Sequence, residues 1–597
     1  MDDDAERSGA AQALTGFGGR EPPNLGASDT EDEQLAPDDG NGAVALPSGT
    51  VPRHLGTAES LEALQERVNR KYGAFGVRAR NEDSERERRV LMDNAWKSTA
   101  WLIAGVFAAS LFLAFASRPT FAGPGEWANS FRLDTVFIVV WGPLLFWAMA
   151  RQKLWKSLRT YLVLALFIEA FSEVMFLQKG EGGYWDSVMW PAAVAFYGTI
   201  KELSGLPGAS LPVFFFVTVG LLGRAVWGKR SDDWAAPPRF ARDALLSFLG
   251  TVVLLAAIGI ARGGQIEWTF RQTIHMLQLP LVGLLFLYAL RVPHDLAAVG
   301  TAYVLTAVVR SLLVVYVYVG VCIPKGITQL PNKPEWCTTH SDTVLFVSAL
   351  VILFAHALEQ RSRRVIVQGL VFGAIIFLGI VLNNRRLAFV SLGIAPLVIY
   401  LALDPSKRKR RVTMALAVAV PLLVGYVLVG SESTSESALL KPAKSIVSVL
   451  DQKDTSSQSR DIENENLIYT LQQSPILVRG FGHEYLASPN NPPVDLSEVF
   501  KNYRLIAHNG VLWLWSIAGV LGFALLWLVY PLAGTLAMRG YRAADTALER
   551  SAALASLGCI AVCVVQIWGD QGLSSYMTLV TFGVCFAVAS RLAVRAA

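Results

Sequence analysis

The stretch "RLIAHNGVLWLWSIAGVLGFALLWLVYP", residues 504–531, decides the fold class. About twenty apolar residues in a row cross the ~30 Å hydrocarbon core of a bilayer as one α-helix. This run has that length, and its first turn carries an ionisable residue, His508, followed by Asn509. The stretch therefore predicts a membrane span with a candidate proton-transfer residue at its mouth.

Similar apolar runs recur along the chain of 597 residues, of which 53% are hydrophobic. Only helices and closed barrels satisfy their backbone polar groups inside lipid, so we expect an all-α polytopic membrane protein. Residues 188–200 are too short and too interrupted for a span and are interpreted as re-entrant or interfacial. We expect about fourteen spans, at 99–117, 134–150, 160–177, 211–227, 244–262, 274–291, 296–321, 343–358, 365–382, 388–403, 412–430, 507–530, 551–568 and 573–590.

Four segments follow from this pattern. Residues 1–97 are mostly acidic and rich in Gly and Pro, and we expect a disordered cytoplasmic tail that is either plainly solvated or docks a partner. It has neither the n-region nor the h-region of a signal peptide. Residues 98–430 form a transmembrane bundle, 431–506 a large periplasmic loop before the last three helices, and 507–597 the C-terminal transmembrane helices.

Loop charges orient the chain. With an internal amino terminus, the internal loops hold most of the loop Lys and Arg, as in "DPSKRKRR", residues 404–411. This bias predicts that both termini are cytoplasmic. Cys322 and Cys337 then face an oxidising compartment, where they either form a disulfide or stay unpaired thiols. No basic patch interleaved with aromatic residues occurs, so nucleic acid is not an expected partner.

The long outer loop holds recognisable local structure. In "SRDIENENLIYTLQQSP", residues 459–475, apolar residues at helical spacing and a terminating proline predict one amphipathic helix on the membrane surface. Those apolar residues are Ile462, Leu467, Ile468 and Leu471. Directly afterwards, Gly480 and Gly482 permit a tight turn.

Cationic residues gather on the outer side. They are Arg385, Arg386, Arg460, Arg479, His483 and His508. Guanidinium groups bind phosphate oxygens, and a histidine can take a proton from a hydroxyl. Together these residues suit a reaction between a phosphate-bearing lipid donor and a hydroxyl nucleophile. Taken singly, each has a plainer interpretation, such as a helix cap for His508 or interfacial snorkelling for Arg385 and Arg386.

Arg310 lies within a predicted span. A charge at that depth costs at least ~2.5 kcal/mol, so such residues face a water-filled cavity or a charged partner. Arg310 is therefore either a substrate-binding residue or one half of a structural pair, with Glu169 or Glu173 as candidate partners.

Three segments in order resemble the O-antigen ligase and O-antigen polymerase superfamily of bacterial inner-membrane glycosyltransferases. The first is "NNRRLAFVSLGIAPLVIYLAL", similar to the family's Ser/Asn-Arg span. The second is "SRDIENENLIYTLQQSPILVRGFGHEYL", similar to its outer-loop pattern, and the third is "AHNGVLWLWSIAGVLGFALLWL", similar to its His-Asn helix. The likeness covers about 385–530 and includes the large loop before the last three spans.

The resemblance implies a GT-C-like enzyme without metal or other cofactor. It moves glycan from an undecaprenyl-pyrophosphate carrier to a hydroxyl at the periplasmic face of the inner membrane, with inversion at the anomeric carbon. His508 is implied as the general base, and Arg385 or Arg386 with Arg460 as the pyrophosphate-binding groups. Asn509 orients the histidine or caps its helix.

Three further residues are expected to contact substrate. Arg479 is one of the outer-side cations, Arg310 is similar to a cavity arginine of the family, and His483 follows the Gly-x-Gly turn of the family's pattern. Clustered Arg charge can stabilise a departing pyrophosphate in place of a metal. One alternative is that Asp461, Glu463 and Glu465 bind a divalent ion through hard oxygen ligands, and the plainer interpretation is a solvated helix face.

Several acceptors fit the same site. We favour a polymerase that joins carrier-linked repeat units into a surface polysaccharide or exopolysaccharide, because the predicted spans are numerous and the long tail can dock polysaccharide assembly and chain-length proteins. The alternatives are a ligase acting on lipid A-core, a protein glycosyltransferase, and a transporter of lipid-linked sugar. A transporter is expected to show paired half-repeats, and the sequence has none that we can see.

Overall fold

The computed structural model describes residues 90, 92–112, 144–168, 192, 196–197, 211–228, 236–292, 295–324, 341–360, 362–383, 385–432, 440, 443–444, 455–476, 478–491 and 504–594. Nearly all of the tail at 1–97, most of the interfacial stretch at 188–200, and the residues Cys337, Glu169 and Glu173 lie outside these ranges. The predictions that concern them stay predictions.

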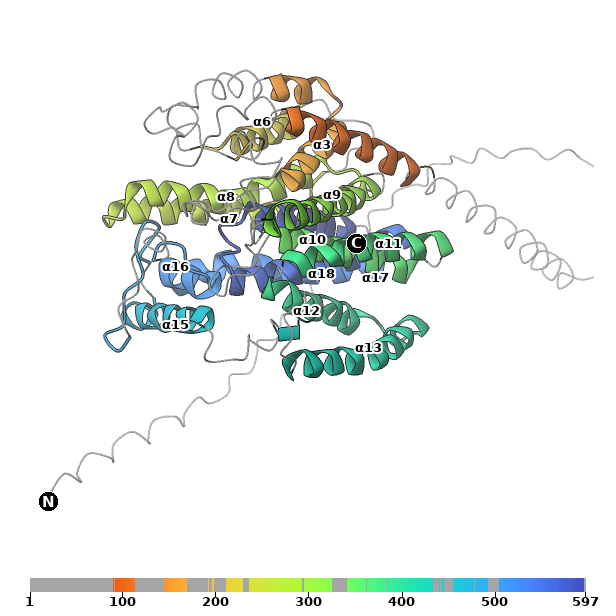
Figure 1. Ribbon diagram of the computed structural model, residues 1–597. Helices are drawn as coiled ribbons and strands as arrows, with labels where there is room; N and C mark the ends of the chain where they lie inside the picture. The colour runs from red at the N-terminus through yellow and green to blue at the C-terminus, as the bar shows by residue number, and fades with distance from the viewer. Residues whose placement is uncertain are drawn as a thin grey trace, which may run out of the picture. The chain divides into compact units, whose positions relative to one another are not determined.

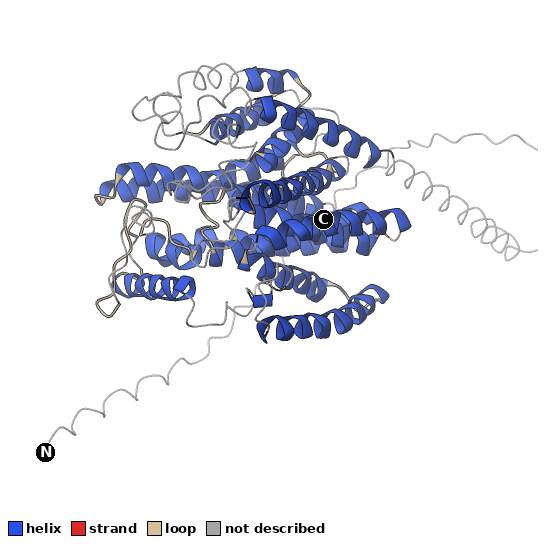
Figure 2. Cartoon of the chain, viewed as in Figure 1, coloured by secondary structure: helices blue, strands red, loops and turns tan. Residues whose placement is uncertain are grey.

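The described part of the chain is helical and contains no strand (Figures 1 and 2). Ten of its helices are long and apolar enough to cross a membrane. They are Met92–Phe112, α7 (Arg239–Ala261), α8 (Ile266–Ala289), α9 (Leu296–Val317) with its π-helical continuation η3 (Tyr318–Cys322), α10 (Ser341–Glu359), α11 (Arg363–Asn383), α13 (Lys407–Glu432), α16 (Gly510–Trp527) with α17 (Val529–Ala543), α18 (Ala547–Gly569) and α19 (Tyr576–Val594). The all-α, multi-pass class is confirmed, and the count of fourteen spans stays a prediction.

Four other described helices matter for the site or the bundle. α6 (Val213–Trp227) and α12 (Arg386–Ala402) are apolar but shorter. α3 (Leu154–Phe167) packs against α9, and α15 (Thr455–Gln473) follows the amphipathic pattern of the outer loop. On α15, Leu467 and Leu471 are buried, whereas Ile468 is exposed.

The centre of the bundle is formed by α8, α10, α17, α18 and α19, which pack against one another. α19 is buried along almost its entire length, whereas α13 is almost wholly exposed. Small residues allow the closest approach: a Cβ atom added to Gly583 of α19 would lie 2.9 Å from the backbone nitrogen of Gly283 on α8. Such contacts between small residues let membrane helices pack backbone to backbone.

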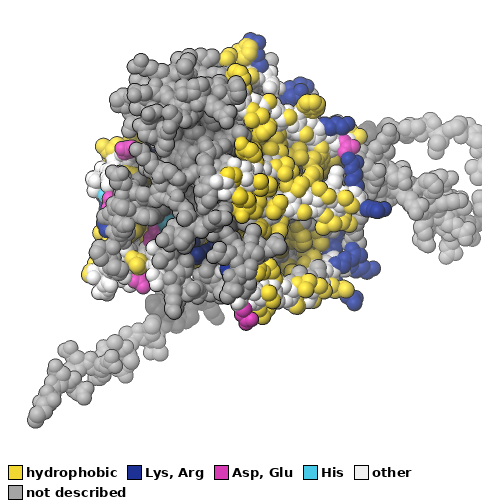
Figure 3. Space-filling model, viewed as in Figure 1, with side chains coloured by type: hydrophobic (Ala, Val, Ile, Leu, Met, Phe, Trp, Pro, Cys, Tyr) yellow, Lys and Arg dark blue, Asp and Glu magenta, His cyan; other side chains and the backbone are white. Residues whose placement is uncertain are grey.

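The surface divides into an apolar belt and a basic edge. Hydrophobic side chains cover the middle of the face seen in Figure 3, and Lys and Arg side chains gather along one border of that belt. Figure 1 shows α15 at the opposite end of the bundle. This is the charge asymmetry on which the predicted cytoplasmic placement of the basic loops rests.

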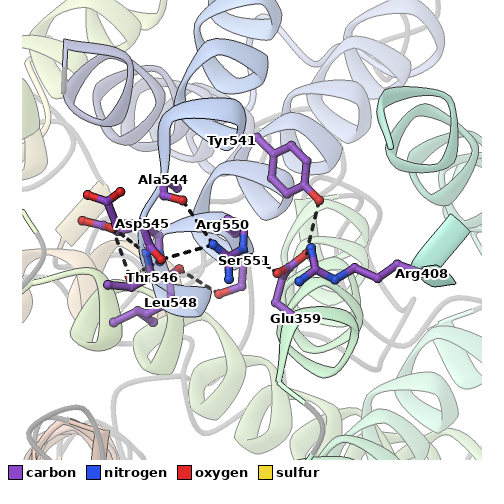
Figure 4. A network of polar contacts seen from close by, with 10 residues as sticks. Glu359, Arg408, Tyr541, Ala544, Asp545, Thr546, Leu548, Arg550 and Ser551 are labelled. Carbon is purple, nitrogen blue, oxygen red and sulfur yellow. Dashed lines mark hydrogen bonds and ion pairs between the residues drawn. The ribbon is translucent and has the colours of Figure 1, made fainter. Parts of the chain in front are cut away.

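A buried carboxylate ties four helices together near one end of the bundle (Figure 4). Glu359, at the end of α10, accepts hydrogen bonds from Arg550 of α18 (2.9 Å) and Tyr541 of α17 (3.3 Å). Arg408, at the start of α13, completes the group with an ion pair of 3.2 Å. We call these four residues the Glu359 cluster.

The span predicted at 507–530 differs from the structure. α16 begins at Gly510, and its helical geometry breaks at Gly519, which has φ 62° and ψ 178°. Only glycine adopts this conformation at low cost. The helical run then continues through α17 to Ala543. The structure therefore has a helix that is broken at Gly519 and ends at Ala543, in place of the regular span predicted to end at 530.

Candidate functional site

Glu463 of α15 holds His508 in two places. His508 Nδ1 lies 2.7 Å from Glu463 Oε2, and the His508 backbone N–H donates to Glu463 Oε1 at 3.0 Å. The Glu463 side chain is 7% exposed and that of His508 is 19% exposed. α15 packs beside α16 (Figure 1), so the helix predicted to lie on the membrane surface positions the histidine.

This contact orients the histidine ring. An ionised carboxylate can only accept a hydrogen bond, and His508 Nδ1 is the ring nitrogen that faces Glu463. The second hydrogen bond, from the His508 backbone N–H, holds the residue against the same carboxylate. In such an arrangement a histidine exchanges protons through Nε2, and the carboxylate stabilises the imidazolium form.

Asn509 caps the broken helix. Its side-chain oxygen accepts from the backbone N–H of Leu512 at 3.1 Å, the arrangement of an N-cap. Its amide nitrogen donates to Asn464 of α15 at 3.0 Å. Asn509 thus holds α15 and α16 together directly beside the base.

A second link between α15 and the bundle closes a ring around His508. Arg460 lies on the same side of α15 as Glu463, one turn earlier, and forms an ion pair of 3.8 Å with Asp570 after α18. The next residue, Gln571, donates its backbone N–H to the His508 carbonyl at 3.0 Å. Gln571 has φ 55°, the only positive φ among the described non-glycine residues, and such strained positions cluster at functional sites. We call these five residues the His508 cluster.

α12 brings the arginine pair to the same end of the bundle. Arg385 is its N-cap residue and is 9% exposed, and Arg386 is its first helical residue. The start of α12 packs on the end of α18: a Cβ atom added to Gly569 would lie 2.7 Å from Leu387. Asp570, which pairs with Arg460, follows Gly569 directly, so both predicted phosphate-binding segments meet at the end of α18.

The turn at Gly480 and Gly482 forms hydrogen bonds to α16 beside its break. Both glycines have positive φ, 84° and 82°. The backbone N–H groups of Arg479 and Gly480 donate to Ile517 at 3.1 and 3.0 Å, and so satisfy a carbonyl group just before the break at Gly519. A Cβ atom on Gly480 would lie 2.2 Å from the backbone nitrogen of Gly259 on α7, so the turn requires glycine there.

Gln272 of α8 links this turn to the His508 cluster. Its side-chain oxygen accepts from the backbone N–H of Gly482 at 2.7 Å. Its side-chain nitrogen donates to the carbonyl group of Leu505, also at 2.7 Å, three residues before His508. One side chain therefore couples the position of the glycine turn to that of the base.

Arg479 and His483 form a basic pair on this turn. Partial burial lowers the pKa of His483 from its ordinary value of 6.5, and the positive charges of Arg479 and Arg262 lower it further. Burial also lowers the pKa of Arg479 from 12.5, although an arginine remains a cation at neutral pH. A neutral histidine beside arginines can donate a hydrogen bond without adding to the local charge.

Arg310 is held by a carboxylate that the sequence analysis did not consider. It forms two hydrogen bonds with Asp342 at the start of α10, at 2.7 and 2.8 Å, and a third with the Phe167 carbonyl at 2.9 Å. The side chains of Arg310 and Asp342 are 3% and 0% exposed. A structural partner therefore exists for Arg310, and its substrate contact stays a prediction.

The acidic residues of α15 do not converge on one point. Glu463 is buried against His508, whereas Asp461 and Glu465, one turn apart, are exposed on another side of the helix. Within the described ranges, no group of three or more His, Cys, Asp or Glu residues is placed to hold a metal ion. Cys559, Cys563 and Cys585 are buried and unpaired, as expected of packing residues within spans.

The contacts of Glu463, Asp570 and Gln571 around His508 were not predicted from the sequence. Glu463 follows Arg460 by three residues and precedes Leu467 by four, which places all three on one side of a helix. That spacing indicates that Arg460 and Glu463 face the same neighbours. Asp570 and Gln571 follow a span at the far end of the sequence, and no local pattern connects them with His508.

Comparison with known families gives a match that covers part of the chain. Residues 371–527 match the family model described as O-antigen ligase. The match runs from within α11 to the end of α16 and includes Arg385, Glu463 and His508. The resemblance to the O-antigen ligase and polymerase superfamily is thereby confirmed for this region of a multi-pass membrane protein. No curated protein matches the chain.

Proposed function

We propose that the protein is a membrane glycosyltransferase that polymerises undecaprenyl-pyrophosphate-linked oligosaccharide units at the periplasmic face of the inner membrane. The observation that carries the proposal is the pair formed by His508 and Glu463, with Nδ1 and Oε2 2.7 Å apart. The match to the O-antigen ligase model supports a ligase- or polymerase-type reaction on a lipid-linked glycan.

The reaction begins at His508 Nε2. This nitrogen takes the proton of an acceptor hydroxyl, whose oxygen forms a bond to the anomeric carbon of the donor sugar. The bond from that carbon to the phosphate oxygen breaks, and its electron pair leaves with the carrier pyrophosphate. Attack opposite to the leaving group inverts the anomeric centre. Glu463 stabilises the imidazolium formed in this step.

The arginines act on the leaving group. Arg385 and Arg386 at the start of α12, with Arg460 on α15, supply positive charge for the pyrophosphate as negative charge develops on it. The ion pair of Arg460 with Asp570 is long, 3.8 Å, and a guanidinium has five N–H donors, so donors remain for phosphate oxygens. No step of this scheme requires a metal ion. Arg479 and His483 on the glycine turn are assigned to binding of the glycan or carrier.

Profiling of cell-surface glycans tests the proposal and separates the acceptors. Cells that lack the protein are complemented with the wild type or with His508→Ala, and the glycans are sorted by length and by attachment. A polymerase predicts single repeat units on the carrier, no long chains, and no rescue by His508→Ala. Long chains that persist on the carrier without reaching lipid A-core indicate the ligase alternative, and full rescue by His508→Ala favours the transporter.

A further inference from the structure

A cavity lies far from the His508 cluster. Its volume is about 550 Å³, and it is lined by residues of α9, α10, α11, α18 and α19 and of the helix Met92–Phe112. Its lining on α18 begins at Ala547, whereas the His508 cluster adjoins the end of that helix at Gly569. At 1.5 Å per residue, the two ends of α18 are ~30 Å apart. The cavity therefore does not belong to the transfer site.

Most of the cavity wall is apolar, and helices long enough to span a membrane form it. Val304 of α9, Leu353 of α10, Ala555 of α18 and Val588 of α19 contribute to it. The volume lies within the ~300–1,000 Å³ typical of small-molecule pockets. A mostly apolar cavity between such helices suits the acyl chain of a lipid.

Two buried polar atoms at the cavity lack partners. Gln360 is 7% exposed and Thr301 is 2% exposed. Neither Gln360 Nε2 nor Thr301 Oγ1 has a hydrogen-bond partner among the described residues. Buried polar groups are normally satisfied, because an unmade hydrogen bond costs free energy. An amide N–H group needs an acceptor, and the ester carbonyl of a lipid is one.

The charges near the cavity define where a headgroup would lie. Arg364 and Asp93 line the cavity and pair at 3.4 Å, and their side chains are 70% and 48% exposed. The carboxylate of Glu359, which also lines the cavity, is already bonded within the Glu359 cluster (Figure 4). Arg364 is the one Lys or Arg in the lining, and its pair with Asp93 is long and exposed, so it can also contact a headgroup phosphate.

We propose that this cavity binds one acyl chain of a membrane glycerophospholipid. The acyl chain fills the cavity between α9 and α18. The ester carbonyl of the lipid accepts a hydrogen bond from Gln360, and the lipid phosphate lies beside Arg364. The bound lipid would occupy a fixed place between the spans, distinct from the lipid that covers the outer surface of α13.

Photolabelling of the full-length protein tests this proposal. The protein is reconstituted in vesicles of phosphatidylethanolamine and phosphatidylglycerol that contain phosphatidylglycerol with a diazirine on its acyl chain. After irradiation, labelled positions are mapped by mass spectrometry and compared with labelling of the exposed α7 residue Leu254, which serves as the internal reference. We expect labelling on the cavity wall, at positions such as Val304 and Ala555, that saturates with the probe.

Filling the cavity is expected to remove that labelling. A Cβ atom on Gly300 would meet only Ile352, at 3.7 Å, so Gly300→Leu has room to project into the cavity. Gly369→Leu, with nothing within 4 Å of its added Cβ, is a second filling variant on α11. We expect each to lower wall labelling at least five-fold relative to Leu254. Gly250→Leu, on α7 with equally open surroundings, is the matched control and is expected to leave it unchanged.

Gln360→Met tests the polar contact. It keeps the side-chain length and removes the donor, and we expect about a ten-fold weaker saturation by the probe. Size-exclusion profiles identify any variant that fails to fold, and two filling variants on different helices keep the test decisive if one fails. Wall labelling that is absent in the wild type, or equal in all variants, would overturn the proposal.

Discussion

The two ends of the bundle each contain a buried glutamate, and the difference between them separates structure from chemistry. Glu359, fully buried, is bonded to two arginines and a tyrosine, so the partners of its carboxylate come from three other helices. Glu463 instead binds one titratable partner, His508, at both its ring Nδ1 and its backbone N–H. A carboxylate bonded to several fixed cations stabilises the fold, whereas one that orients a single histidine suits acid–base chemistry.

The largest expected effect comes from removing the base. We predict that His508→Ala lowers the rate of glycan transfer by about 10²–10⁴-fold, because no group remains to take the hydroxyl proton. Chain elongation on a purified lipid-linked repeat unit measures this rate. Gln472→Ala, at an exposed position of α15, is the control and should keep wild-type activity. Retention of activity by His508→Ala would show that His508 is not the general base.

A smaller loss is expected when the orienting carboxylate is changed. Glu463→Gln keeps the shape of the side chain but offers no charge to an imidazolium, so we predict about a 10²-fold fall in kcat. KM and the thermal midpoint should change little, and Glu463→Asp should recover part of the rate. A purely structural Glu463 would instead show a fall in thermal midpoint that matches the loss of activity.

Breaking the Glu359 cluster should give the opposite result. Glu359→Gln leaves Arg550 and Arg408 without their carboxylate, and we predict a loss of about 3 kcal/mol in the free energy of unfolding. Transfer activity per folded molecule should persist, because the cluster lies far from His508. Thermal unfolding in detergent measures the change, with the exposed Glu432→Gln as control. Equal stability in both variants would contradict a structural role.

The broken helix offers a stability test at the His508 end. Gly519→Ala places a side chain at φ 62° and should cost about 1–3 kcal/mol. Gly250→Ala, within regular α7 and with open space around it, should stabilise by about 0.5–1 kcal/mol. Thermal midpoints of the two variants should move in opposite directions. A stabilised Gly519→Ala would mean that the break is not required.

The smallest effect concerns pH. Because the pKa of folded His483 is depressed below 6.5, protonation favours the unfolded chain, and the stabilising contribution is lost as pH falls below about 6.5. His483→Gln cannot be protonated, so we predict a flatter stability curve between about pH 6.5 and 5. Thermal midpoints measured across this range provide the comparison. Identical acid dependence in the wild type and the variant would show that another group is responsible.

The sequence predicts the helices of this molecule better than it predicts which side chains contact one another. Apolar length alone locates most spans, because lipid requires each segment to satisfy its own backbone. The predicted orientation of the spans also selected His508, Arg385 and Arg460 as candidate site residues, because few cationic residues lie on the predicted outer side. The break at Gly519 was missed because one glycine in an apolar run is also compatible with a regular helix.

The contacts that were not predicted join residues that are far apart in the sequence. The predicted partners of Arg310 lie on the span at 160–177, yet Asp342, thirty-two positions after Arg310, holds it in the structure. Glu463 was weighed as a metal ligand because its neighbours in sequence are acidic, and only the packing of α15 on α16 shows that it faces a histidine. Asp570 could not be linked to Arg460 without the fold.

The break in α16 bears on how the chain is made. The carbonyl group of Ile517 lies within an apolar helix, and it accepts hydrogen bonds from the backbone of Arg479 and Gly480. These two residues precede α16 in the chain, so the ribosome adds them before it adds the helix that needs them. The hydrogen-bond donors for the break at Gly519 are therefore already synthesised when that part of the helix forms.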